Sequence, residues 1–309
     1  MRSTGESPFR KIARNWNVDS DRLMHNGEPQ IPLHISIQNN SGSVEHYYHF
    51  LLGFLIPLAA LFSREPPDAR IVLIRSCGPM DRHLRELGIS GLTTIDKVAH
   101  RGMRSQTDGA EFVSLQGFDF GPQNLTYNQD GIRSGVAFVR DWLRKKTDQF
   151  SAEIVRSWSN RSPKILLIER GEPDPFYFTE ASEGKAAGNR RRTIANHSKL
   201  LVALSQRYCA CCNLVLERLS LAEQIAWYSS ADVVVAQQGA ALSNVVWMRP
   251  GTAVIEIAPT ATQHYPTYRA LAALTGVRFA QIPQADNFAP VDPSLVIEAI
   301  EKVSNLNSG

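Results

Sequence analysis

The clearest hydrophobic pattern lies in the second half of the chain, where short apolar runs alternate with amphipathic stretches. The apolar runs predict buried strands at 164–169, 213–216, 232–236, 253–257 and 277–282. The amphipathic stretches predict helices at 198–207, 220–230, 268–275 and 293–303, and the turn at 237–244 opens another. Ser220 and Glu223 form a capping-box pattern that marks one helix start. Strands that alternate with helices indicate βαβ units and a parallel sheet.

The first half of the chain carries the same alternation less regularly. Residues 1–45 are polar, with one strand expected at 33–37. The apolar stretch 50–62 contains Gly53 and Pro57 and is too short to cross a bilayer core of about 30 Å, so it predicts a buried helix. Further strands are expected at 70–74, 93–98 and 111–115, and further helices at 84–87 and, in two pieces, at 136–158.

The pair Ser162-Pro163 ends the last helix of the first half, because the residue before a proline avoids helical geometry. We place a domain boundary there, which gives an N-terminal α/β domain at 1–160 and a C-terminal α/β domain at 161–309. A length of 309 residues fits two domains of about 150 residues each. We also consider that the last helix packs back onto the N-terminal domain.

The composition, with 43% apolar and 20% charged residues, excludes a chain that is disordered throughout. The formal net charge of +3 is too small to indicate nucleic-acid binding, and no signature of such binding is present. The N-terminus lacks the apolar core of a secretory signal. The four cysteines show no paired spacing, so we expect reduced thiols in a cytoplasmic protein that associates with membranes at most weakly and peripherally.

Polar groups follow the predicted strands of the second half, which is where open parallel sheets bind their ligands. Arg170 follows the first of these strands, Gln238, Gly239 and Ala240 follow the third, and Glu256 lies near the end of the fourth. The helix that starts after Gly239 offers amides and a partial positive charge to an anion. Glu256 is placed to accept hydrogen bonds from sugar hydroxyl groups.

Arg190, Arg191 and Arg192 lie in the polar loop after Arg170, and the planar guanidinium groups of these arginines suit a diphosphate. Together these groups predict a nucleotide that carries a pyrophosphate. The arginine triplet also fits a solvated surface, the glycine also fits plain backbone geometry, and Glu256 also fits a salt-bridged or capping carboxylate. No glycine-rich dinucleotide fingerprint and no P-loop is present, which disfavours both of those nucleotide-binding classes.

A second candidate cluster, Glu45-His-Tyr-Tyr-His49, immediately precedes the apolar helix. Its histidines and glutamate suit a general base or a metal site. The same residues also fit a pair of hydrogen-bonded histidines that position the start of a helix. A metal hydrolase that uses His46 and His49 is a further alternative, and it predicts stoichiometric metal in the purified protein.

Six short segments occur in a recognisable order. They are His-Tyr-Tyr-His-Phe at 46–50, Leu-Ile-Glu-Arg at 167–170, Arg-Arg-Thr-Ile-Ala-Asn at 191–196, Leu-Ser-Leu-Ala-Glu-Gln-Ile at 219–225, Gln-Gly-Ala-Ala-Leu-Ser-Asn at 238–244 and Pro-Gly-Thr-Ala-Val-Ile-Glu at 250–256. In this order the chain resembles glycosyltransferase family 61, as a bacterial-type member. That family includes plant xylosyl- and arabinosyltransferases, animal O-linked N-acetylglucosaminyltransferases and bacterial polysaccharide enzymes.

The resemblance implies a GT-B fold, in which two Rossmann-like domains face a cleft, with the acceptor on the N-terminal side and the nucleotide sugar on the C-terminal side. It implies an inverting transfer from a nucleotide sugar, expected to be a UDP-sugar, to a glycan, lipid-linked or glycoside acceptor, with no cofactor and no obligatory metal. The pair Asp19-Ser-Asp21 matches a metal-binding motif by its letters only, and we treat it as chance.

On this hypothesis His49 is the general base, with His46 or Glu45 as alternatives. The residues expected to bind the donor are Arg170, Arg191, Arg192 and Gln238 at the diphosphate, Gly239 and Ala240 through their amides, and Asn196, Asn244 and Glu256, of which the last two contact the nucleoside or sugar.

Two positions depart from the pattern of the resembled family. Gln238 stands where that family has a histidine, and Gly53 stands where it tends to have an acidic residue. A neutral amide donates a hydrogen bond but carries no charge, and a glycine supplies no carboxylate. These departures favour an alternative from another functional class, a catalytically degenerate protein that binds a nucleotide or glycan and acts through a partner.

Overall fold

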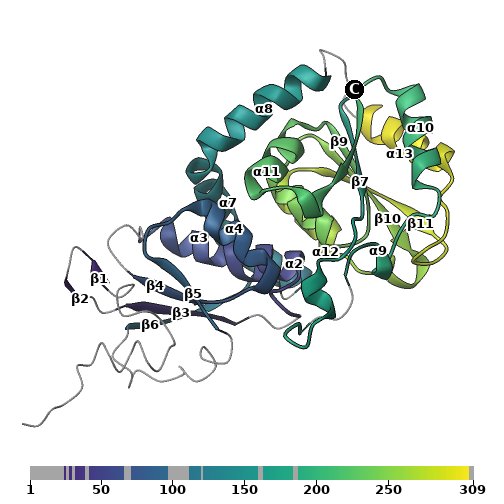
Figure 1. The fold of residues 1–309 in the computed structure, drawn as a ribbon. Coiled ribbons are helices and arrows are strands. Elements are labelled where there is room, and N and C mark those ends of the chain that lie inside the picture. The colour runs from purple at the N-terminus through teal and green to yellow at the C-terminus, as the bar shows by residue number, and fades with distance from the viewer. Residues whose placement is uncertain are drawn as a thin grey trace, which may run out of the picture.

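The computed structural model describes residues 24–25, 28–29, 32–38, 42–65, 71–96, 111–119, 121–158, 163–183 and 187–305. Within these residues the chain forms two parallel sheets with flanking helices, and a short antiparallel pair, β1 (Met24–His25) and β2 (Glu28–Pro29). Figure 1 shows the N-terminal sheet in purple and blue and the C-terminal sheet in teal to yellow. The predicted α/β class with parallel strands is confirmed.

The N-terminal sheet is entirely parallel in the described residues. It consists of β3 (Leu33–Gln38), β4 (Val72–Arg75), β5 (Leu92–Ile95) and β6 (Glu111–Gln116) in the order β5-β4-β3-β6. Each lies where the apolar pattern predicts a strand. The strand expected at 93–98 ends at Ile95, and residues 97–98 lie outside the described residues.

The apolar stretch after β3 forms the buried helical segment of this half. It starts with α2 (Tyr47–Phe50), continues through a π-helical turn, η2 (Leu51–Leu55), and ends as α3 (Ile56–Phe62). Its side chains are almost entirely buried, in agreement with the prediction. The π-helical turn was not predicted, because a single widened turn does not change the apolar pattern. No helix among the described residues is both long and apolar enough to cross a membrane.

Three further α-helices of the N-terminal half lie before α8 (Arg144–Trp158) in the described residues. They are α4 (Asp81–Leu87), α6 (Pro122–Tyr127) and α7 (Gln129–Trp142). Helix α7 packs along α3, and Gly135 permits the close approach because a Cβ atom there would overlap the carbonyl oxygen of Ile56.

The C-terminal sheet agrees closely with the hydrophobic pattern. It consists of β7 (Ile165–Glu169), β8 (Cys211–Val215), β9 (Val233–Gln237), β10 (Ala253–Pro259) and β11 (Arg278–Gln284) in the order β11-β10-β9-β7-β8, all parallel. Every residue of β9 and β10 is buried, because helices cover both faces of the sheet.

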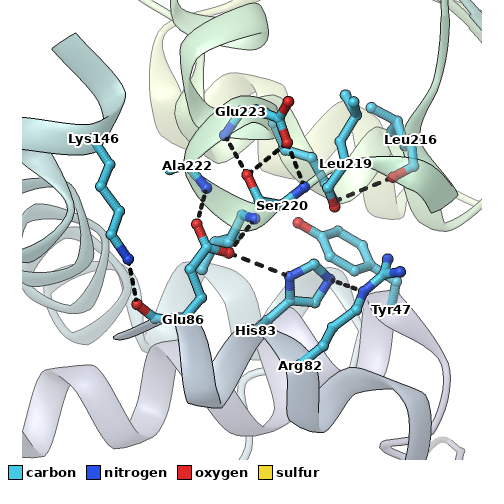
Figure 2. Close-up of polar contacts among 12 residues, drawn as sticks. Tyr47, Arg82, His83, Glu86, Lys146, Leu216, Leu219, Ser220, Ala222 and Glu223 are labelled. Atoms are coloured by element: carbon cyan, nitrogen blue, oxygen red, sulfur yellow. Dashed lines mark hydrogen bonds and ion pairs between the residues drawn. The ribbon is translucent and has the colours of Figure 1, made fainter. Parts of the chain in front are cut away.

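The α-helices described in this half are α9 (Gly188–Arg191), α10 (His197–Arg207), α11 (Leu221–Ser230), α12 (Thr267–Thr275) and α13 (Pro293–Asn305). The predicted capping box is confirmed, because Glu223 N donates to Ser220 Oγ at 3.2 Å and Ser220 N donates to Glu223 Oε2 at 2.8 Å (Figure 2). Helix α13 packs against β10, β11 and α10, so it belongs to the C-terminal layer rather than packing back onto the N-terminal domain.

Helices α8 and α4 both take part in the contacts that join the halves of the molecule. Helix α8 (Arg144–Trp158) precedes the predicted boundary but packs against α11, where the Trp158 and Trp227 rings lie 5.2 Å apart. From α4, the carboxylate of Glu86 accepts hydrogen bonds from Leu221 N at 2.6 Å and Ala222 N at 2.9 Å, so it caps a helix of the other half (Figure 2).

Candidate functional site

A cavity of about 760 Å³ is lined by residues from both halves of the chain. The N-terminal half contributes residues 46–49 at the start of α2, the turn after β4 and Asp119 after β6. The C-terminal half contributes the segments that follow β7, β8 and β9. The cavity therefore lies beyond the carboxyl ends of parallel strands, where the sequence places the candidate binding groups.

Two arginines in the cavity wall donate to the same backbone oxygen. Arg170 Nη2 lies 2.7 Å from Gln238 O, and Arg192 Nη1 lies 2.9 Å from it. Within the described residues, neither Nε atom has a hydrogen-bond partner, and neither guanidinium forms an ion pair with a carboxylate. Burial, followed by the charge of Arg192, lowers the pKa of Arg170 to about 10. The wall thus holds two close positive charges suited to an anion.

Gly239 allows Arg170 to occupy this place. A Cβ atom at position 239 would overlap the guanidinium group of Arg170, so any other residue there would displace this arginine. The helix that follows, η8 (Ala240–Trp247), is a 3₁₀-helix, and Gly239 and Ala240 both line the cavity.

The arginine triplet is divided by the fold. Arg191 and Arg192 line the cavity, whereas Arg190 is exposed, lies 3.7 Å from Glu172 and covers the ring of Phe178 at 4.8 Å. Two members of the triplet thus line the cavity, and the third lies on the solvated surface.

Gln238 is buried, 4% exposed, and its side chain is held on both sides. Its Nε2 donates to Thr262 O at 3.0 Å, and its Oε1 accepts from Arg192 Nη1 at 3.3 Å. The neutral side chain therefore helps to orient one of the two arginines.

His49 lines the cavity and is paired with a carboxylate that the sequence analysis missed. Its Nδ1 lies 2.7 Å from Asp119 Oδ2, and the side chains are 18% and 0% exposed, respectively. The only signal for Asp119 in the sequence is its position just after a predicted strand, where many unrelated polar residues also lie. The pairing joins residues 70 positions apart, which no local pattern reveals.

The other two candidates in the cluster at 45–49, His46 and Glu45, both make structural contacts, but of the two only His46 lines the cavity. The His46 ring stacks on Tyr177 at 5.1 Å and lines the cavity, and burial lowers the pKa of His46. Glu45 lies outside the cavity wall, where its Oε2 accepts from Glu183 N at 2.7 Å and its backbone oxygen accepts from the Tyr177 hydroxyl.

Three expected donor ligands do not line the cavity. Asn196 exchanges two hydrogen bonds with the backbone of Val291, at 2.8 and 2.9 Å. Asn244 is fully buried and accepts from the Tyr47 hydroxyl at 2.7 Å. Glu256 is fully buried on β10, accepts from Gln281 Nε2 at 2.8 Å, and has its pKa raised by burial.

Two tyrosines line the cavity that the sequence analysis did not single out. Tyr48 and Tyr268 come from opposite halves, and their rings meet edge to face at 6.0 Å. Burial raises the pKa of both above the ordinary value of 10.0, so their hydroxyl groups stay protonated even in alkaline solution near pH 10. Each lies in a helical sequence pattern. A tyrosine of the hydrophobic core gives the same pattern, so the sequence does not mark either residue as part of a site.

The described residues contain no cluster of three histidine, cysteine or acidic side chains arranged to hold a metal ion. Asp19-Ser-Asp21 lies outside the described residues. His49 and His46 are instead engaged with Asp119 and Tyr177.

The sequence model of the family Glycosyltransferase 61 matches residues 47–255, more than half of the chain. Over 91 residues the chain is 33% identical to protein O-linked-mannose beta-1,4-N-acetylglucosaminyltransferase 2 of Bos taurus, a stretch that covers 28% of this chain and 16% of that protein. Over 118 residues it is 34% identical to the protein of the same name of Tetraodon nigroviridis, covering 37% of this chain and 19% of that protein. The matched stretch is thus less than a fifth of the length of these relatives.

Proposed function

The chain belongs to the glycosyltransferase 61 family, and on this premise we propose that it transfers a sugar from a nucleotide-sugar donor to a hydroxyl group of an acceptor. The proposed donor is a UDP-sugar, and the proposed acceptor is a glycan, a lipid-linked sugar or a glycoside. The names of the matched relatives, which specify N-acetylglucosaminyl transfer, support this reaction class.

The observation that carries the proposal is the pair of guanidinium groups at Gln238 O, with Arg191 beside them on the cavity wall. A diphosphate offers several anionic oxygens to such planar donors. Charged hydrogen bonds contribute about 1.5–3 kcal/mol each. The two arginines repel each other and have lost part of their hydration. A bound diphosphate offsets both effects, because its negative charges lie beside the two guanidinium groups.

The proposed reaction is a direct displacement with inversion at the anomeric carbon. The acceptor oxygen forms a bond to that carbon, the bond to the diphosphate oxygen breaks, and His49 takes the proton of the acceptor hydroxyl. The arginines stabilise the negative charge that develops on the departing diphosphate. Because these side chains supply that positive charge, we propose that transfer needs no metal, and we expect the rate to persist in EDTA.

The architecture supports a GT-B arrangement, in which the donor occupies the C-terminal side of the cavity and the acceptor the N-terminal side. Two parallel sheets place their carboxyl ends toward the cavity, and Arg170 and His49 reach it from different halves. A cytoplasmic location stays a prediction, which fractionation of the producing cells tests.

A second candidate function is binding of a nucleotide without transfer, through which the protein acts on a partner. Gln238 favours it, because a neutral amide tied to Arg192 supplies no additional charge at the diphosphate. This candidate predicts that a nucleoside diphosphate binds while no nucleotide sugar is consumed.

The decisive experiment compares UDP with uridine in calorimetric titrations of the wild type and the Arg170→Gln variant. We expect the variant to bind UDP at least about tenfold more weakly, the equivalent of one charged hydrogen bond, and to bind uridine as the wild type does. Equal weakening of both ligands would place Arg170 away from the diphosphate.

Arg190→Gln is the matched control, because it removes the same charge at an exposed position outside the cavity. It should leave UDP binding unchanged. Product analysis with a panel of nucleotide sugars then separates transfer from binding alone, and a folded protein that binds no nucleoside diphosphate contradicts both candidates.

A further inference from the structure

The contact between His49 and Asp119 depends on an unusual junction in the N-terminal half. The segment after β6 crosses the π-helical turn of the buried helix, and Phe118 N donates to Leu52 O at 2.9 Å. In a regular α-helix that carbonyl accepts from the amide four residues later. Here the Ile56 amide donates to Leu51 O instead, and Pro57, five residues after Leu52, has no N–H, so Leu52 O accepts from a segment elsewhere in the chain.

Two glycines let this segment approach closely. A Cβ atom at Gly117 would lie 2.7 Å from the carbonyl oxygen of Gly53. A Cβ atom at Gly53 would lie 2.8 Å from Asp119 Cγ and 2.9 Å from Asp119 Oδ2. The Asp119 carboxylate therefore fills the space that a side chain at position 53 would need, and the two cannot coexist there.

Position 53 lies one helical turn after His49, so it is the local position from which a side chain reaches the same ring. With glycine at 53, the carboxylate arrives instead from a segment distant in sequence. A buried carboxylate that accepts from Nδ1–H keeps the proton on that nitrogen, so the ring's lone pair lies on Nε2.

We propose that Asp119 is the positioning residue of His49, and that Gly53 and Gly117 are glycines because they make room for its carboxylate. The catalytic consequence rests on the proposed glycosyl transfer, whereas the placement of the ring proton does not. In this arrangement Asp119 holds the imidazole in one tautomer at the cavity wall and touches no substrate itself.

The first test is nitrogen-15 NMR of protein labelled at histidine, with the His49 signals assigned by the His49→Gln variant. We expect the wild type to carry its proton on Nδ1. The Asp119→Ala variant should shift toward the Nε2–H tautomer, which a free imidazole favours. Asp130→Ala, which removes an exposed carboxylate paired with Arg133 at 3.6 Å, is the control and should leave the signals unchanged.

The second test moves the carboxylate to the local position. The double variant Gly53→Asp with Asp119→Gly should restore the Nδ1–H signal and keep the protein folded. In transfer assays, Asp119→Ala should lower kcat at least about 100-fold, with the donor KM within about twofold, as expected for loss of base function. The double variant should recover to within about tenfold of the wild type, because the carboxylate acts through the ring it holds.

These outcomes separate the two proposals. Nδ1 without a proton in the wild type, or an unchanged tautomer in Asp119→Ala, overturns the positioning role whether or not transfer is detected. If the tautomer responds as expected but no donor is consumed, the positioning role stands and the proposed transfer fails. If Asp119→Ala does not fold, the double variant decides, since a folded double variant without the Nδ1–H signal contradicts the inference.

Discussion

Replacing Glu86 with alanine should weaken the attachment between the two halves of the molecule. Its carboxylate on α4 accepts from two amides in the first turn of α11, at 2.6 and 2.9 Å. Because the capping box of Ser220 and Glu223 bonds their own amides, Glu86 serves two amides that this box leaves unpaired. The alanine variant therefore exposes those amides to water rather than unfolding the helix outright.

The expected loss is about 2 kcal/mol in the free energy of unfolding. A capping side chain contributes about 0.5–2 kcal/mol to the free energy of unfolding. Glu86 should lie at the upper end of this range, because its hydrogen bonds involve a charged carboxylate. The Glu86 side chain is 13% exposed, so solvent weakens the interaction only slightly. For a chain of this size, 2 kcal/mol corresponds to a fall in Tm of about 4 °C.

Thermal unfolding followed by circular dichroism measures this effect, with Glu301→Ala as the matched control. Glu301 accepts from Arg207 at 2.7 Å, but its side chain is 43% exposed, so its removal should cost less than about 1 kcal/mol. Equal Tm values for the two alanine variants would refute the capping role of Glu86.

The effect of Glu86 should also depend on pH in a defined direction. Burial acts to raise the pKa of Glu86, but the nearby His83 ring and the hydrogen bonds from the two amides outweigh it and hold the pKa below its ordinary value of 4.5. A carboxyl group whose pKa is lowered by folding stabilises the protein above its unfolded value and loses that contribution as the pH falls. The Tm difference between the wild type and Glu86→Ala should therefore shrink below about pH 4.5. A constant difference contradicts this.

Two other substitutions probe the C-terminal half. Gly239→Ala should keep the fold but weaken UDP binding at least about tenfold by displacing Arg170, and an unchanged affinity in calorimetry would contradict the close approach. Burial raises the pKa of Glu256 in the folded protein. A carboxyl group with a raised pKa makes the folded protein less stable as the pH rises from the unfolded pKa toward the folded pKa. Glu256→Gln should therefore unfold at a higher temperature than the wild type at about pH 8 and gain less at about pH 5. Equal gains at both pH values count against this explanation.

The strands and most helices of this protein follow from local chemistry. The apolar runs of β7, β9 and β10 are buried on both faces of the sheet, so their side chains show as continuous hydrophobic stretches. The start of α11 is encoded within four residues, because its capping box bonds only to itself. The position of Arg170 at the cavity could also be predicted from the sequence, because this residue directly follows a predicted strand.

Local sequence patterns did not predict the direction in which each side chain of the arginine triplet points. Only the folded structure shows that Arg190 lies near Glu172 while Arg192 donates to Gln238. Asn244 was expected at the donor, but it is engaged with Tyr47, which lies 197 positions earlier in the chain.

The sequence by itself determined the α/β class, the parallel strands and the candidate positive charges, because each depends on neighbours within one or two helical turns or on a strand's own burial. The tertiary structure decided which residues meet in the cavity. Asp119 reaches His49 only because a widened helical turn and two glycines let a distant segment cross the helix. Such a contact depends on the packing of elements 70 residues apart, and hydrophobic periodicity carries no information about that distance.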